Sequence, residues 1–108
     1  MAKFHGIQIY EILENGNLLN AIYTNTGNNY DIDNEIATKT KSLNNGIVGT
    51  YDVRYIESGN PSVTDCILEI SKKGQAYEFV WEKNGTPIWK GIGLMAGSNY
   101  VAVSYSHP

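Results

Sequence analysis

The chain has 108 residues, of which 18% are charged, and its formal net charge is −3. This length predicts one domain with a modest core. The acidic balance, with no basic stripe, argues against nucleic acid or an anionic membrane surface as a partner. The apolar runs are too short to span a bilayer.

The N-terminal segment and the cysteine content bear on the compartment. The segment from Met1 to Ile7 contains one lysine but no apolar stretch of the kind found in signal peptides. Cys66 is the only cysteine, so no disulfide can form within the chain. Both observations favour a cytoplasmic location.

The first part of the chain predicts two strands and one ambiguous segment. Residues 4–13 and 18–24 are rich in strand formers and are separated by an Asn-Gly turn. Residues 25–29 predict an irregular loop. The segment 31–43 is compatible with two structures. Apolar residues at helical spacing after an acidic cap favour a short helix near 33–42, whereas a Thr-Lys-Thr-Lys run favours a polar edge strand.

The rest of the chain consists of alternating segments bounded by turn signals. Five more strands are predicted, over 47–57, 65–72, 75–83, 86–96 and 99–105. Their short connectors imply that sequential strands pair antiparallel. The predicted fold class is therefore all-β, an antiparallel meander of about eight strands that closes into a barrel and removes its exposed edges. An open, strongly curved sheet or a sandwich is the alternative.

Side-chain parity predicts one continuous inner face across three of these strands. Its residues are Tyr51, Val53, Tyr55, Leu68, Ile70, Tyr77, Phe79 and Trp81. Aromatic rings dominate small cores, so we expect this set first of all to form the core. Barrels of about eight strands can also hold one small ligand. The candidate ligand-binding residues are Tyr51, Tyr55, Tyr77, Phe79 and Trp81, for an apolar or aromatic molecule.

The last two strands have no clearly polar face. Trp89, Gly91, Gly93 and Met95 share one face of the segment 86–96. Strand glycines often allow a sheet to bend, which is one interpretation of this face. The other is that these four residues form an interface with a second copy of the chain, since two-fold homo-oligomers are common. An apolar outer patch could extend this interface through Ile7, Ile9, Leu19, Ala21 and Tyr23.

The region 47–105 resembles small calycin-type barrels, the group that includes lipocalins and avidins. The resemblance rests on Gly49-Thr-Tyr51, on the alternating segments around Leu68 and Phe79, on Gly91-Ile-Gly-Leu94 and on Val101-Ala-Val103. Those barrels open on a Gly-x-Trp strand, whereas this chain has Tyr51 at that position, in the middle of the sequence. The phrase Trp-Lys-Gly-Ile-Gly-Leu also resembles bacterial β-domains. The resemblance implies an eight-stranded barrel with a cavity and maps no ligand contact.

Catalytic and metal-binding patterns are weak. His5 and His107 lie near opposite ends of the chain with no third ligand in view, so we expect no metal site. The oxygen-rich run from Asn29 to Glu35 lacks the order of a calcium loop and is expected to be a solvated loop or a helix cap. Cys66 is expected to be a small buried hydrophobe. We predict no cofactor and no enzymatic activity.

Two functions remain on sequence grounds. The first is a non-enzymatic barrel that binds a small molecule against its aromatic interior. The second is a structural or interaction module that acts as a homo-oligomer through its C-terminal strands.

Overall fold

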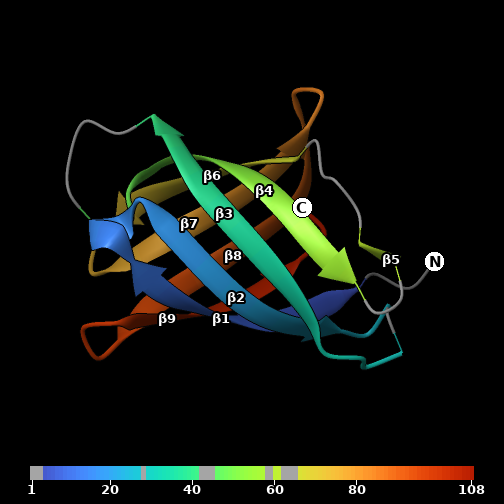
Figure 1. Cartoon of the computed structure of the whole chain (residues 1–108). Coiled ribbons are helices and arrows are strands. Elements are labelled where there is room, and N and C mark those ends of the chain that lie inside the picture. Colours follow the sequence, from blue (N-terminus) through green and yellow to red (C-terminus); the bar gives the residue numbers. More distant parts are fainter. Residues whose placement is uncertain (1–3, 28, 42–45, 58–59, 62–65) are drawn as a thin grey trace.

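The computed structural model describes residues 4–27, 29–41, 46–57, 60–61 and 66–108. Three quarters of it, 75%, is β-strand (Figure 1). In chain order the elements are β1 (His5–Leu13), the 3-10 turn η1 (Glu14–Gly16), β2 (Leu18–Asn25), β3 (Asp33–Lys41), β4 (Gly49–Glu57), β5 (Asn60–Pro61), β6 (Cys66–Lys73), β7 (Ala76–Lys83), β8 (Thr86–Ala96) and β9 (Tyr100–Ser106).

The strands form one antiparallel sheet in the order β3-β2-β1-β9-β8-β7-β6-β4-β5. A further pairing between β3 and β4 closes the eight long strands into a barrel, visible in Figure 1 as a ring of tilted arrows. β5 is a two-residue extension that pairs with the end of β4. The predicted closed antiparallel meander is therefore confirmed. Closure pairs the backbone groups that would otherwise remain at a sheet edge.

The segment whose structure was ambiguous in the sequence is the strand β3. Asp33, Glu35 and Ala37 are buried, while the residues between them are more exposed, which is the period-two pattern of a strand. β3 pairs with both β2 and β4, so it is an interior strand of the barrel. The helical alternative is thus wrong for residues 33–41. Among the described residues, none forms a helix long and apolar enough to cross a membrane.

Positive-φ turns join the strands where the sequence predicted them. Asn84 (φ 52°) and Gly85 (φ 80°) form the two-residue connection between β7 and β8. Two consecutive positive φ values match a type I′ turn, whose twist suits the flanking strands. Asn15 (φ 58°) and Gly16 (φ 93°) lie in η1 between β1 and β2. Asn45, of the third Asn-Gly pair, lies outside the described residues.

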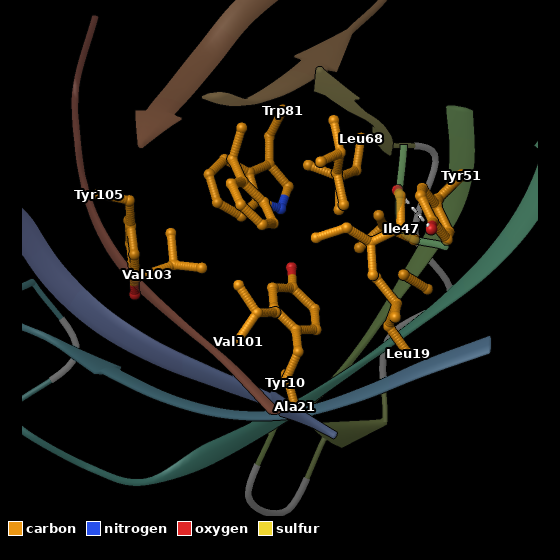
Figure 2. Packing of buried hydrophobic residues seen from close by; sticks show 14 of the residues in the cluster. Tyr10, Leu19, Ala21, Ile47, Tyr51, Leu68, Trp81, Val101, Val103 and Tyr105 are labelled. Atoms are coloured by element: carbon orange, nitrogen blue, oxygen red, sulfur yellow. Dashed lines mark hydrogen bonds between the residues drawn. The ribbon is translucent and has the colours of Figure 1, made fainter. Parts of the chain in front are cut away.

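The core occupies the inside of the barrel (Figure 2). The predicted inner face is confirmed, because its residues are buried or pack as half-buried side chains against the core. The buried hydrophobic residues are Tyr10, Leu19, Ala21, Ala37, Ile47, Tyr51, Val53, Cys66, Leu68, Ile70, Phe79, Trp81, Val101, Val103 and Tyr105. Stacked rings run through its centre, with Phe79 5.8 Å from Tyr10 and 5.9 Å from Trp81 between ring centroids.

One end of the barrel is closed by η1 and the segment before β4. The Tyr51 hydroxyl lies 2.7 Å from the Ile47 carbonyl oxygen and 2.9 Å from that of Gly16, and can donate its proton to either. Gly46 donates its backbone N–H to the Asn15 carbonyl at 3.1 Å. A side chain at Gly16 would collide with the Gly46 backbone, so the close approach of these segments requires glycine there.

Candidate binding cavity at one end of the barrel

The end of the barrel opposite η1 contains a cavity of about 180 Å³. Strands β1, β3 and β8 begin at this end, and β2, β4, β7 and β9 finish there. The residues that line the cavity are Gln8, Tyr23, Asn25, Asp33, Glu35, Tyr55, Trp81, Trp89 and Tyr105. The cavity therefore combines an aromatic wall with a small number of polar groups, as ligand sites commonly do.

Glu35 is the deepest polar residue of this site. Its side chain is only 1% exposed, and the Tyr10 hydroxyl donates a hydrogen bond to its carboxyl group. Tyr10, Ala21 and Glu35 lie opposite one another across β1, β2 and β3 and therefore share the inner face. The small side chain of Ala21 leaves the space across which Tyr10 reaches the carboxyl group.

Burial changes the acidity of this pair. Loss of hydration raises the pKa of the Glu35 carboxyl from 4.5 to about 7, and the hydrogen bond from Tyr10 together with the nearby donor groups of Gln8 and Trp81 opposes the rise. The pKa of Tyr10 lies well above its ordinary value, because the hydroxyl is buried and faces Glu35. Glu35 is thus a carboxyl group that can gain or lose its proton near neutral pH.

Two buried donors next to Glu35 have no hydrogen-bond acceptor. They are Gln8 Nε2 and Trp81 Nε1, on side chains that are 3% and 1% exposed. Both lie close enough to the Glu35 carboxyl to favour its ionised form, but neither makes a hydrogen bond of ordinary geometry. Figure 2 shows the Trp81 indole nitrogen and the Tyr10 hydroxyl directed toward the middle of the barrel. Buried donors of this kind usually have a partner, either protein, water or ligand.

The aromatic wall is held by ring contacts between strands. The Tyr105 ring lies 5.6 Å from Trp81 and 5.3 Å from Trp89, the latter edge to face at 88°. On the other side of the cavity, Tyr23 and Tyr55 meet edge to face at 5.8 Å. Such contacts restrict the rings, so that their faces are presented in fixed directions.

The mouth of the cavity is bordered by the two ends of the described chain. Trp89 stacks on His107 at 4.6 Å and lies 6.5 Å from the Phe4 ring. The Tyr105 ring crosses over Gly6, where a Cβ atom would come within 2.6 Å of it. Glycine at this position therefore gives Tyr105 room to reach the wall.

The five predicted ligand-binding residues separate into three locations. Tyr55 and Trp81 line the cavity. Tyr51 and Phe79 are fully buried in the core, and the Tyr51 hydroxyl serves the closed end. Tyr77 is half-buried near the closed end, beside a wider hollow of about 420 Å³. That hollow is bordered mainly by exposed or half-buried residues, and none of its described lining residues has a buried polar side chain, so it offers less to recognise a ligand.

The four predicted interface residues lie on the inner face of β8. Gly93 is buried, and a Cβ atom there would meet Phe79 at 2.6 Å. Trp89 and Met95 are half-buried and pack against the core. The opposite face of β8 carries Ile92 and Leu94, which are 65% and 59% exposed. This corrects the face on which the sequence placed a subunit contact, because both faces of β8 are apolar and parity alone did not separate them.

The polar residues of the cavity were not recognised as such from the sequence. Asp33 and Glu35 were expected in a solvated loop or helix cap, but both are buried on the inner face of β3. Gln8 alternates with Ile7 and Ile9, so the apolar side chains of β1 point outward there and the polar one inward. The usual apolar-in pattern is inverted at this end, and an inverted pattern is itself the signal of a polar interior.

Comparisons with protein-family models, curated proteins and solved structures found no match. Among the described residues, no group of three or more His, Cys, Asp or Glu is placed to hold a metal ion. The Cys66 thiol is buried, and burial raises its pKa to about 11. The chemistry of the cavity follows from its own side chains. It can enclose a small organic molecule, and Glu35 can accept a hydrogen bond from it or pair with a positive charge.

Proposed function

We propose that this protein is a non-enzymatic barrel that binds a small organic ligand in the cavity lined by β1, β2, β3, β4, β7, β8 and β9. The observation that carries the proposal is the coincidence of a cavity with two buried donors, Gln8 Nε2 and Trp81 Nε1, that have no acceptor. A ligand with apolar or aromatic surface would contact the ring wall, and an acceptor atom on it would pair with these donors.

Buried donors such as Gln8 Nε2 and Trp81 Nε1 destabilise the folded protein when they stay unpaired. A buried donor without an acceptor costs about 1–3 kcal/mol in stability. Apolar side chains of similar shape would avoid this cost, so polar groups at these positions are better explained by a partner in the cavity. The closed end differs in this respect, because the Tyr51 hydroxyl has two carbonyl acceptors there.

The test is a screen of small aromatic and aliphatic compounds against the ¹⁵N-labelled protein. Trp81 and Trp89 are its only tryptophans, and both line the cavity, so their two indole N–H signals report on the site. We expect at least one class of compound to shift both signals in a saturable manner.

A blocking variant separates cavity binding from surface binding. Asn25→Trp places a large ring at the lining of the cavity and is expected to abolish the shifts. Asn20→Trp adds the same ring on the exposed face of β2 and should leave them intact. If no compound shifts the indole signals, or if Asn25→Trp leaves the shifts unchanged, the proposal fails.

A second candidate function is self-association through the outer face of β2, β1, β9 and β8, supported by its exposed apolar rows. Residues opposite one another on neighbouring strands share a face of the sheet. One row consists of Ile22, Ile9, Ala102 and Leu94, and the next contains Ile7, Ser104 and Ile92. Within this outer apolar face, Ile7 is 62%, Ile9 46% and Ile22 49% exposed.

A second copy of the chain is the partner that this face suits best. The rows contain no charged side chain, and a two-fold contact brings the same patch of each subunit together. Contiguous exposed apolar surface is uncommon on monomers and typically marks an interaction site. The face lies on the outside of the strands that also build the cavity, so both functions are compatible.

A further inference from the structure

The cavity has a distinct charge character. Two of its lining residues, Asp33 and Glu35, carry carboxyl groups, and both are buried. Its other polar lining residues are the amides Gln8 and Asn25 and the tyrosines, and no lysine or arginine is among the described lining residues. His107 contacts Trp89 at the mouth but does not line the cavity. A ligand in this space would therefore meet the buried Glu35 carboxyl group, and none of the described lining residues places a lysine or arginine beside it.

The surroundings of Glu35 act on its ionisation in two opposite directions. Tyr10 donates a hydrogen bond to the carboxyl group, and the donors of Gln8 and Trp81 also favour the charge. Burial works in the opposite direction, because a carboxylate out of water without a counter-charge is strongly disfavoured. The three donors stabilise the anion only in part, and a cation bound in the cavity would remove the remaining imbalance.

The aromatic wall suits the same kind of ligand. Trp81, Trp89 and Tyr105 meet around one side of the cavity, and Tyr23 and Tyr55 around the other. The face of an aromatic ring attracts a cation, and cages of several aromatic rings recognise quaternary ammonium groups. The cavity volume of about 180 Å³ limits the ligand to a compact molecule.

We propose that the cavity binds a small organic cation, an amine or quaternary ammonium compound that also carries an oxygen acceptor. This inference rests on the proposed binding function and specifies its ligand class. The ammonium group lies between the rings and the Glu35 carboxylate, and the oxygen atom accepts hydrogen bonds from Gln8 Nε2 or Trp81 Nε1. Glu35 is the group that distinguishes a cation from a neutral molecule of the same shape.

The test compares choline with 3,3-dimethyl-1-butanol, in which a carbon atom replaces the charged nitrogen and the hydroxyl group is kept. Both are titrated into the ¹⁵N-labelled protein at about pH 8, where Glu35 is largely ionised. The indole N–H signals of Trp81 and Trp89 give the two dissociation constants. We expect choline to bind at least about tenfold more tightly than its neutral isostere.

Two variants show whether Glu35 is the cause. Glu35→Gln keeps the shape and the Tyr10 contact but removes the charge, so the preference for choline should disappear while the isostere still binds. Glu69→Gln removes an exposed charge on β6 and should keep the wild-type preference within about threefold, since exposed charges contribute little.

The outcomes distinguish this inference from the proposed function. Equal or tighter binding of the isostere, or a preference for choline that survives Glu35→Gln, would overturn the cation site and leave a binding barrel for neutral molecules. No indole shift with either probe also overturns the cation site. In that case the screen of neutral compounds described above decides separately whether the cavity binds ligands at all.

Discussion

Glu35 illustrates how one buried residue can make the whole barrel sensitive to pH. Its pKa is about 7 in the folded protein and 4.5 is its ordinary value. Between these values the folded state keeps a proton that the unfolded state has released, so the free energy of unfolding falls as the pH rises. The loss becomes complete about one pH unit above 7 and amounts in total to roughly 3 kcal/mol.

We therefore predict that Glu35→Gln raises stability at high pH. Wild-type protein should lose roughly 3 kcal/mol of its free energy of unfolding between about pH 5 and about pH 8 beyond what the variant loses. Urea unfolding at the two pH values measures this. Subtracting the free energy of unfolding of the variant from that of the wild type removes the contributions of all other titrating groups. Glu11→Gln, at an exposed position on β1, is the control and should follow the wild type. Parallel pH profiles for wild type and Glu35→Gln would contradict the prediction.

The same carboxyl group links ligand binding to pH. An organic cation binds the ionised form, so its affinity should fall about tenfold for each pH unit below 7 and level off above it. Choline titrations at several pH values measure the slope, and Glu35→Gln should show none. The titratable groups that face Glu35 or share its cavity are Tyr10, Tyr23, Asp33, Tyr55, Cys66 and Tyr105. For Tyr10, Tyr55 and Tyr105, burial raises the pKa above its ordinary value, so they stay protonated in this range.

Among the elements, η1 is held to the segment before β4 by the Tyr51 hydroxyl and by the backbone hydrogen bond from Gly46 to Asn15. Tyr51 joins the turn to the segment before β4 through the carbonyl groups of Gly16 and Ile47. Tyr51→Phe keeps the ring in the core but leaves these carbonyl oxygens without that donor. We predict a loss of about 1–2 kcal/mol in the free energy of unfolding.

Chemical unfolding of Tyr51→Phe beside Tyr30→Phe measures this loss. Tyr30 is 72% exposed, so the removal of its hydroxyl should leave stability unchanged. Equal stability of the two variants would mean that Tyr51 closes the end by packing alone. Ligand binding at the opposite end should persist in both variants, because Tyr51 does not line the cavity.

The elements also show what the sequence could and could not predict. Strands whose inner residues are apolar, such as β6 and β7, follow from alternation and turn signals. β3 did not, because Asp33 and Glu35 occupy positions where the alternation rule expects apolar side chains. The inner face of β8 could not be recovered from the Asn84-Gly85 turn, because a bulge between Trp81 and Glu82 shifts the register. Lys83 pairs with Thr86, but Trp81 pairs with Trp89 and not with Ile88.

At the scale of the whole molecule, the two ends of the barrel and its outer wall have different properties. One end is tied shut by η1, and the other contains buried polar groups and aromatic rings. The closed meander can be predicted from the sequence, because alternating side chains and turn residues are enough to set the order and the antiparallel pairing of neighbouring strands. The cavity is formed by side chains from strands that are distant in sequence, such as Gln8, Glu35 and Trp81. A single sequence without information on strand pairing does not show which of these side chains come together.

The outer apolar face predicts that the protein self-associates. If two copies meet through β2, β1, β9 and β8, a charge in the central row must be buried without a partner and should prevent association. We predict that wild-type protein sediments as a dimer and that Leu94→Lys or Ile9→Lys yields a monomer. Both positions are exposed in the single chain, at 59% and 46%, so neither change should disturb folding.

Ile56→Lys is the matched control for this experiment. Ile56 is 38% exposed and lies on β4, across the barrel from β1 and β9, so the variant should remain dimeric. Sedimentation velocity over a range of concentrations, with circular dichroism to verify the fold, measures all four proteins. A wild-type monomer at high concentration would refute the contact. If the dimer persists in Leu94→Lys and Ile9→Lys but dissociates in Ile56→Lys, the subunit contact lies instead on the side of the barrel that contains β4.

Since the cavity opens at an end of the barrel, the dimer leaves its mouth accessible, and ligand affinity should be the same in dimeric and monomeric proteins.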